Sequence, residues 1–462
     1  MSSRREFLNQ CIAGLTLTML PSGAIAEQGV RYYQLSAEPA PHFFDKNPLA
    51  TDLWLYNKTS PGPLIQANKG EILDVEFFNN LDQSTTIHWH GIRNINSMDG
   101  VPDLTQSLVE PGEKFHYRFP LNDAGTFWYH SHNKAWEQVA RGLYGPLVVY
   151  DHDTNEDDVG SDIVILADDW LLNSDEQIDS NSLGNLGHWS HGGRLGNALS
   201  INGKFKPAIR VSSNGPVRLR FLNAANARIL NFELSGGVMM KVICSDGSPC
   251  EPFDTNRITL GPAQRVDVLI EDASDLVELL EVSSSKALNA AIFEPIFSKL
   301  TSVKNPLSND PYYSWPDTKN AKEIYVHMQG GAMGNLSKAT FEGKERSLRD
   351  LALKEAKLWA FNGNIGGYGL SLAEIELGDV VVIRAWNDTG WPHVMHLHGH
   401  HFWVDSSEFG EKKRALLRDT YLMQPGEEAE LVFIANNPGA WLFHCHMLEH
   451  HAAGMGGVIY IS

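Results

Sequence analysis

Short apolar stretches rich in β-branched and aromatic residues recur along the chain, and polar turns rich in Gly, Pro, Asn and Asp separate them. This texture is typical of strands. The clearest stretches are Ile72–Phe78, Phe115–Phe119, Thr126–His130, Val380–Trp386 and Ala429–Ile434. Helical periodicity is scarce, and Leu348, Leu351 and Glu355 predict one short helix between domains. The pattern indicates an all-β chain built of sandwiches.

The sequence contains an internal repeat. A turn glycine lies 18 positions before a His-x-His pair twice, at Gly70 and at Gly378. A Pro-Gly-Glu turn lies 19 positions before another such pair twice, at Pro111 and at Pro425. We therefore interpret the first and last thirds of the chain as copies of one sandwich.

The middle third has the same strand texture, at Val217–Asn223 and up to Ile270, but no His-x-His pair. We interpret it as a third copy without a metal site. At about 150 residues per domain, 462 residues are enough for three domains. An acidic stretch, His152–Asp162, and an Asn-, Pro- and Ser-rich stretch near residues 300–320 resemble linkers. The predicted domains are residues 27–152, 153–305 and 306–462.

Composition excludes several classes of protein. Hydrophobic residues at 42% and aromatic residues at 10% are too many for a disordered chain. With 37 basic and 56 acidic residues the formal charge is −19, so the chain lacks the basic excess of a general nucleic-acid binder. Beyond the N-terminus no apolar run reaches the about 18 residues of a membrane-spanning helix. We expect a monomer that contacts neither nucleic acid nor, once mature, a membrane.

Residues 1–26 have the order of an export signal. Arg4 and Arg5 precede an apolar stretch, Cys11–Leu20, and a small-residue site, Ala24–Ala26, follows. The paired arginines favour a twin-arginine signal over an ordinary secretory one. The predicted location is therefore periplasmic or secreted.

Three cysteines remain after this signal. Cys244 and Cys250 bracket a turn, and an oxidising compartment favours a disulfide between them, with two separate thiols as the alternative. Cys445 is then unpaired, which requires another explanation.

Four His-x-His pairs are the strongest chemical signal. Residues i and i+2 of a strand project from the same face, so each pair presents two imidazoles to one point. Four pairs at matched positions in two repeats predict a cluster of several metal ions between the two domains. The pairs are His88/His90, His130/His132, His396/His398 and His444/His446.

Cys445 lies between His444 and His446 and therefore points to the opposite face, toward a different centre. His393 has the opposite parity from His396, and His450 and Met455 follow the cysteine. Two imidazoles, one thiolate and a weak axial thioether are the ligands of a blue-copper site. Zinc, which is redox-inert, has no use for the thioether.

The first repeat supports this interpretation, because Thr85, Ser131 and Trp136 stand where the last repeat has His393, Cys445 and His450. The copy without the thiolate thus lacks its imidazole partners as well. In the last repeat, Cys445 is joined to two predicted cluster ligands by a few covalent bonds. One-electron oxidation at one site is thereby coupled to multi-electron reduction at another, for which O2 is the natural acceptor.

These motifs resemble those of the three-domain multicopper oxidases, which include laccases and ascorbate oxidase. The resemblance spans the chain after the signal and implies three cupredoxin-like Greek-key β-sandwich domains with four copper ions. It implies a type 1 copper in the third domain and a trinuclear cluster between the first and third. His88 and His396 would hold type 2 copper. The type 3 ligands would be His90, His130, His132, His398, His444 and His446. The family passes four electrons, one at a time, from a reducing substrate to O2, releasing water.

Water formation needs protons beside the cluster. Asp99 resembles the acidic relay residue of the family, and a turn-forming Asp before Gly100 is the alternative. Many bacterial relatives have a second acid where this chain has His451, which either carries protons itself or is exposed. Glu449 either orients ligands or faces solvent. His400 and His401 are expected to pack near the ligands without binding metal.

The reducing substrate is less well defined. Only 11 methionines are present, and His327, Met328 and Met333 form a thin candidate for binding the soft Cu(I) ion. We therefore expect a laccase-like oxidase of phenols and aromatic amines, with a cuprous-ion oxidase as the alternative. The segment Gly187–Gly192 either borders the donor pocket or is a plain surface loop.

Overall fold

The computed structural model describes residues 29–45, 49–151, 162–213, 216–274, 277–296, 311–406, 408–409 and 413–462. The predicted signal of residues 1–26 lies outside these ranges, as do both predicted domain boundaries, so all three stay predictions. No helix within the described ranges is long and apolar enough to cross a bilayer.

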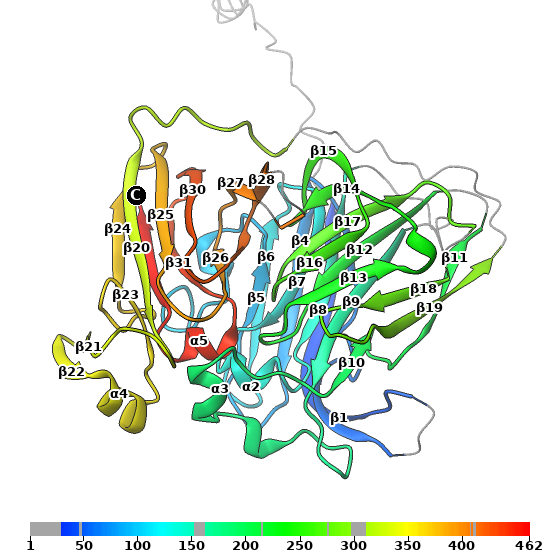
Figure 1. Cartoon of the computed structure of the whole chain (residues 1–462), viewed down its shortest axis with the longest axis horizontal. Helices are drawn as coiled ribbons and strands as arrows, with labels where there is room; N and C mark the ends of the chain where they lie inside the picture. The colour runs from blue at the N-terminus through cyan, green and yellow to red at the C-terminus, as the bar shows by residue number, and fades with distance from the viewer. Residues whose placement is uncertain are drawn as a thin grey trace, which may run out of the picture.

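Strands hold 51% of the residues, and each of the five predicted strands is present, which confirms the all-β prediction. They are β4 (Ile72–Asn79), β6 (Lys114–Pro120), β7 (Gly125–Ser131), β25 (Val380–Asn387) and β30 (Glu428–Ile434). The seven sheets of the described residues follow one another along the chain as three sandwiches, blue to cyan, green, and yellow to red in Figure 1.

The first sandwich pairs the sheet β2-β1-β4-β6 with the sheet β3-β8-β7-β5. Its other elements are β1 (Val30–His42), β2 (Thr51–Tyr56), β3 (Ile65–Asn68), β5 (Ile87–His90), η1 (Asn96–Met98), α2 (Ala135–Gln138) and β8 (Tyr144–Tyr150). Trp89 and Phe127 lie in its buried core. Their strands, β5 and β7, also carry the first two histidine pairs.

The second sandwich pairs the sheet β10-β9-β12-β17-β14-β15 with the sheet β11-β19-β18-β13-β16. Its strands are β9 (Asp162–Trp170), β10 (Ala198–Ile201), β11 (Ala208–Ser212), β12 (Val217–Asn223), β13 (Leu230–Leu234), β14 (Met240–Ser245), β15 (Ser248–Thr255), β16 (Arg257–Leu260), β17 (Arg265–Ile270), β18 (Glu278–Glu281) and β19 (Leu288–Ile296). Short helices η3 (Ser180–Ser182), α3 (Leu186–Ser190) and η4 (Ser235–Gly237) lie in its loops.

The third sandwich pairs the sheet β23-β20-β25-β30-β27-β28 with the sheet β24-β32-β31-β26-β29, beside a small hairpin of β21 and β22. Its remaining elements are β20 (Lys322–Gly330), β21 (Lys338–Phe341), β22 (Lys344–Ser347), α4 (Leu348–Glu355), β23 (Trp359–Phe361), β24 (Ser371–Ile375), β26 (His393–Leu397), β27 (Phe402–Ser406), β28 (Arg414–Arg418), β29 (Thr420–Met423), β31 (Gly439–Cys445), α5 (Leu448–Ala452) and β32 (Gly456–Ile461). The predicted helix is present as α4, but it lies within this sandwich and not between domains, because β20 precedes it in the same sheet as β25.

Strand register brings the histidine pairs together in the same way in both repeats. His88 of β5 lies opposite His130 of β7, and His396 of β26 lies opposite His444 of β31. Near these strands, α5 contacts both α2 and α3, so all three sandwiches meet beside the histidines (Figure 1).

The predicted disulfide between Cys244 and Cys250 is wrong, because both are free thiols. On the β14–β15 hairpin, Cys244 lies opposite Pro249. Cys250 is one residue further on and therefore projects from the other face. It packs into the core of the second sandwich, whereas Cys244 lies 3.6 Å from an Arg218 guanidinium nitrogen.

We expect Leu219→Ala to destabilise the protein by about 2–5 kcal/mol, because this fully buried residue of β12 leaves a cavity in the second core. Leu288→Ala is the matched control, since half of that side chain is exposed on the same sandwich. Its effect is expected within about 0.5 kcal/mol. Urea unfolding followed by tryptophan fluorescence measures both, and equal losses of stability would contradict the core assignment.

Candidate metal centre

The four His-x-His pairs meet between the first and third sandwiches, and all eight imidazoles are buried. The ring of His88 stacks on that of His398 with centroids 3.9 Å apart, and His90 stacks on His396 at 3.8 Å. Each pair of the first repeat therefore faces a pair of the last repeat. The cluster predicted from strand parity is present as a geometric arrangement.

One nitrogen of several imidazoles is fixed by the backbone, and the scheme repeats in the two domains. His88 Nδ1 donates to the Asp99 carbonyl and His396 Nδ1 to the Asp419 carbonyl, each at 2.8 Å. His130 Nδ1 donates to the carbonyl of residue 131, and His444 Nδ1 to that of residue 445, each at 2.9 Å. These bonds select the tautomer whose Nε2 carries a lone pair.

The free nitrogens converge. His88 Nε2, His90 Nδ1 and His396 Nε2 are buried without a hydrogen-bond partner. His398 Nε2 lies 3.0 Å from His444 Nε2, and two unprotonated nitrogens at that distance need a cation between them. Three-residue groups with ligand atoms within 4.8 Å of one another are His88/His396/His398, His88/His90/His130 and His132/His398/His444. The donor set fits a cluster of metal ions that bind imidazole.

Burial also sets the protonation state of this cluster. It lowers the pKa of His396 to about 3 and moves the pKa of His398 and His444 well below the usual value. At neutral pH these imidazoles are uncharged, the form that binds metal.

Cys445 belongs to a separate site on the other face of β31, as its parity predicted. Its Sγ lies 3.5 Å from His393 Nδ1 and 3.7 Å from His450 Nδ1, and the two nitrogens are 3.0 Å apart. Burial raises the pKa of the thiol to about 12, so the chain alone does not ionise it. A bound soft cation supplies the missing charge, and two imidazoles with one sulfur fit type 1 copper.

The rest of this second site is built from the core of the third sandwich. Met455 is buried there, and its carbonyl accepts the Cys445 backbone N–H at 3.1 Å. The indole of Trp359 lies against the rings of His393 and His450, at 5.0 and 4.4 Å. This apolar packing keeps water away from the cysteine.

The first sandwich closes the equivalent position with its own side chains. Thr85, where the third sandwich has His393, donates its hydroxyl hydrogen to Gln138 Oε1 at 2.7 Å. Ser131 is buried, and Trp136 packs against Trp189. These side chains stand in the first sandwich at the positions that His393, Cys445 and His450 occupy in the third.

Asp99 lies fully buried against the cluster. Its Oδ2 accepts from His398 Nδ1 at 2.8 Å, its carbonyl binds His88, and its Oδ1 has no hydrogen-bond partner. The turn before Gly100 and the contact with two imidazoles are therefore both present. The carboxylate therefore lies within hydrogen-bond distance of a cluster imidazole.

Glu449 is buried, and His451 is partly buried. The His451 ring lies 4.3 Å from that of His444, and burial lowers its pKa to about 3. Glu449 does not face solvent, because its Oε1 accepts from Asn226 Nδ2 of the second sandwich at 2.9 Å. The imidazole of His400 packs on Phe433, and His401 lies nearby.

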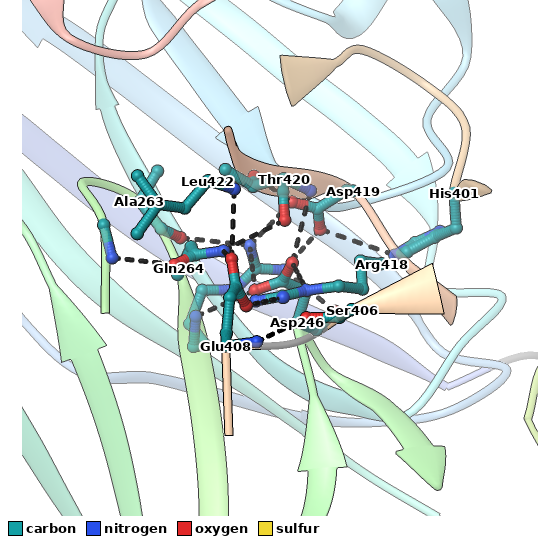
Figure 2. Close-up of polar contacts among 12 residues, drawn as sticks. Asp246, Ala263, Gln264, His401, Ser406, Glu408, Arg418, Asp419, Thr420 and Leu422 are labelled. Atoms are coloured by element: carbon teal, nitrogen blue, oxygen red, sulfur yellow. Dashed lines mark hydrogen bonds and ion pairs between the residues drawn. The ribbon is translucent and has the colours of Figure 1, made fainter. Parts of the chain in front are cut away.

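One carboxylate beside the cluster, that of Asp419, is not indicated by any of the sequence motifs. Asp419 Oδ1 accepts from His90 Nε2 at 3.0 Å, and its backbone carbonyl holds His396. Figure 2 shows Asp419 beside Arg418, Asp246 and Glu408, where the second and third sandwiches meet. The available signal was the charged pair Arg418-Asp419 within an otherwise apolar run of strands.

The segment after α3 is not a plain surface loop. The His191 carbonyl accepts from His450 Nε2 at 2.7 Å, so the second sandwich covers the outer edge of a predicted type 1 ligand. The His191 ring is exposed and lies 5.3 Å from that of Trp391.

Comparison with known proteins agrees with this geometry. Multicopper oxidase family models match residues 42–154, 161–275 and 340–462. The chain is 29% identical to multicopper oxidase MmcO of Mycobacterium tuberculosis, over 96% of this chain and 90% of that protein. It is 31% identical to the solved structure of Lac15 from a marine microbial metagenome, with a TM-score of 0.71 over 93% of this chain and all of that one.

A third similar protein is a multicopper oxidase from Campylobacter jejuni described as a metallo-oxidase. The two are 27% identical with a TM-score of 0.77, over 94% of this chain and 92% of that one. Members of the family bind four copper ions, of types 1, 2 and 3. The three family models, together with a relative above 30% identity along nearly the whole chain, show that this protein belongs to the multicopper oxidase family and is an oxidoreductase.

Proposed function

We propose that this multicopper oxidase is laccase-like and oxidises phenols and aromatic amines, one electron at a time, while reducing O2 to water. The position of Cys445 carries the coupling of two centres, because its thiol lies beside His393 and His450 while the neighbouring His444 and His446 lie beside cluster imidazoles. The choice of an aromatic donor rests on the surface over the type 1 site. A cuprous-ion oxidase is the alternative.

The proposed ligands follow the geometry. His393, Cys445, His450 and Met455 would hold type 1 copper, and His88 and His396 type 2. The six remaining imidazoles would hold the type 3 pair: His90, His130, His132, His398, His444 and His446. When bound, the copper ions take up electrons singly and deliver four of them to O2.

The chain joins the two centres through its own bonds. One peptide bond separates Cys445 from His444, and another separates it from His446. Because β31 fixes the cysteine and His444 on opposite faces, the distance between the centres is set by a single strand.

Asp99 is the proposed source of protons for water formation. Its Oδ2 accepts from His398 Nδ1, and its Oδ1 lies 3.3 Å from His88 Nδ1 without a hydrogen-bond partner. His451 occupies the place of the second acid, but its lowered pKa keeps it neutral at neutral pH. Asp99 accepts a hydrogen bond from a cluster imidazole, and this contact is why we propose it as the relay.

The surface over the type 1 site supports an aromatic donor. Trp391 donates its indole N–H to the Ala332 carbonyl at 3.0 Å, which fixes the ring beside the exposed His191. Two rings held at an angle form a surface on which a phenol can stack. Met333, 76% exposed, lies at the same surface, packed over Gly390.

The cuprous-ion alternative draws on that same methionine and on the metallo-oxidase from Campylobacter jejuni. The other two residues of the candidate Cu(I) site, His327 and Met328, lie in different surroundings from Met333. Met328 is fully buried in the core, whereas His327, its neighbour on β20, stacks on Trp386. Met333 is left with no other thioether beside it on this part of the described surface, since the other exposed methionine, Met239, lies in the second sandwich.

We also propose that residues 1–26 export the chain through the twin-arginine route to the periplasm or beyond. This route carries folded proteins, which suits a chain whose metal ligands come from two distant domains. The proposal rests on Arg4, Arg5 and the small-residue site Ala24–Ala26.

Oxygen uptake by the copper-loaded protein separates the two donor classes. We expect rapid uptake with a phenol and little uptake with Cu(I). The reverse ranking would favour the cuprous-ion oxidase, and no uptake with either donor at full copper occupancy would contradict an active oxidase. Reactions with the protein omitted correct for spontaneous oxidation of Cu(I).

Replacing Cys445 by Ser should abolish the blue absorption and the oxidation of donors while the cluster keeps its copper. The reason is that a hydroxyl is a poor ligand for this soft site, and none of the eight imidazoles is altered. Metal analysis should show the loss of one of the four copper ions. Cys250→Ser, which removes a thiol far along the chain, should leave the colour unchanged. A blue Cys445→Ser protein would contradict the type 1 assignment.

Asp99→Asn should slow O2 reduction by about 10²–10⁴-fold, because the amide keeps the hydrogen bond from His398 but cannot pass on a proton. Reduction of the blue site by donor under anaerobic conditions should be unaffected. Stopped-flow spectroscopy of reoxidation by O2 measures the step directly. Wild-type rates of reoxidation would remove Asp99 from proton delivery.

A further inference from the structure

The second sandwich supplies none of the predicted ligands. One of its side chains nevertheless contacts Asp419, the residue that is hydrogen-bonded to two of those ligands. Arg265 begins β17, is fully buried and spans all three sandwiches. Its Nε donates to the Thr126 carbonyl of the first sandwich at 3.1 Å, and its Nη1 to Asp419 Oδ1 of the third at 2.7 Å. Its Nη2 also donates to Asp419 Oδ2, and two carbonyls of its own sandwich, at Ala263 and Asp246, accept further bonds at 3.2 and 3.0 Å.

Asp419, the partner of this guanidinium, fixes imidazoles from two domains. Its Oδ1 accepts from His90 Nε2 of the first sandwich, and its backbone carbonyl accepts from His396 Nδ1 of the third. The opposite nitrogens, His90 Nδ1 and His396 Nε2, are the ones left buried without a partner. Asp419 thus determines, through its carboxylate for His90 and its backbone carbonyl for His396, which nitrogen each ring turns toward the metal.

The chain leaves room for this pair by a glycine next to the ligand. Gly91 follows His90 with φ +84°, and a Cβ at that position would collide with both the Arg265 guanidinium and the Asp419 carboxylate. The local backbone is therefore shaped around the contact and not only around the histidine.

The arginine balances part of the negative charge of the buried carboxylates around it. Three buried carboxylates, Asp246, Glu408 and Asp419, share two guanidiniums, those of Arg265 and Arg418. Figure 2 shows four of these five groups in one layer between the sandwiches. Without Arg265, Asp419 would keep no guanidinium partner, and only the Thr420 hydroxyl and the imidazoles of His90 and His401 would remain beside its carboxylate.

We propose that Arg265 is a positioning residue of the trinuclear copper centre, through which the second sandwich, itself without copper ligands, fixes Asp419 and thereby the orientation of His90 and His396. Its planar fork binds both oxygens of Asp419 and three carbonyls at once. A lysine, with a single ammonium group, cannot reproduce that arrangement. This inference rests on the proposed assignment of the imidazoles as copper ligands.

The experiment compares Arg265→Lys with Arg220→Lys in the full chain loaded with copper. Arg220 is an equally buried arginine of the second sandwich that also touches the first, donating to Thr126 Oγ1 at 2.9 Å. Its carboxylate partners, Asp162 and Asp267, touch none of the predicted ligands. It therefore controls for the loss of a buried arginine between domains.

Arg265→Lys is expected to weaken copper binding at the cluster by about 10–100-fold in competition with a chelator. It should also change the type 2 copper signal in electron paramagnetic resonance while the blue absorption persists. Arg220→Lys should keep the wild-type signal and affinity, whatever it does to the unfolding temperature. Asp419→Asn keeps the shape of the side chain but loses the ion pair with Arg265, and it should change the same signal. This second variant keeps the inference testable if Arg265→Lys does not fold.

Wild-type cluster signals in both Arg265→Lys and Asp419→Asn would overturn the inference, as would an equal loss of cluster copper in Arg220→Lys. The wild-type chain is loaded in parallel. If it binds no cluster copper, the ligand assignment itself fails, together with this inference. If it binds all four ions and the variants do so equally, only the positioning role fails.

Discussion

The burial of eight imidazoles against one another is the constraint on which the rest of this structure depends. A buried polar atom without a partner costs about 1–3 kcal/mol, and His88 Nε2, His90 Nδ1 and His396 Nε2 all lack one. Folded proteins rarely leave such atoms together. The outer nitrogens of six of the imidazoles, by contrast, are held by carbonyls or carboxylates, so the interior of the cluster is reserved for cations that the chain itself does not provide.

The two-residue period of a strand turns this constraint into two coupled centres. β31 places His444 in the cluster and Cys445 in the core of the third sandwich, next to Trp359 and His393. The first sandwich has the same strand but fills the corresponding space with Thr85 and Gln138. One repeated fold therefore carries either a mononuclear metal site or ordinary packing, according to a few side chains on the inner face.

Local rules were sufficient to predict the strands, the repeat and the grouping of the ligands, because parity and spacing act within one or two strands. They failed where the outcome depends on pairing across the chain. The register of the β14–β15 hairpin separates Cys244 from Cys250, and a sheet shared with β20 places α4 inside a domain. Asp419 was missed because its partners, His90 and Arg265, lie more than 150 residues away in sequence.

The middle sandwich shows why a copy without ligands is kept. Its His191 carbonyl covers the outer edge of His450, its Asn226 holds Glu449 of α5, and its Arg265 holds Asp419. The first contact is a hydrogen bond to a predicted copper ligand, and the second is with the residue that precedes that ligand. The third is with a carboxylate that accepts a hydrogen bond from another predicted ligand. Because metal sites need ligands held in fixed orientation, these contacts give the second sandwich a part in both centres. A two-domain chain with the same histidines would keep every ligand but would lose both the arginine that holds Asp419 beside His90 and the carbonyl that holds His450.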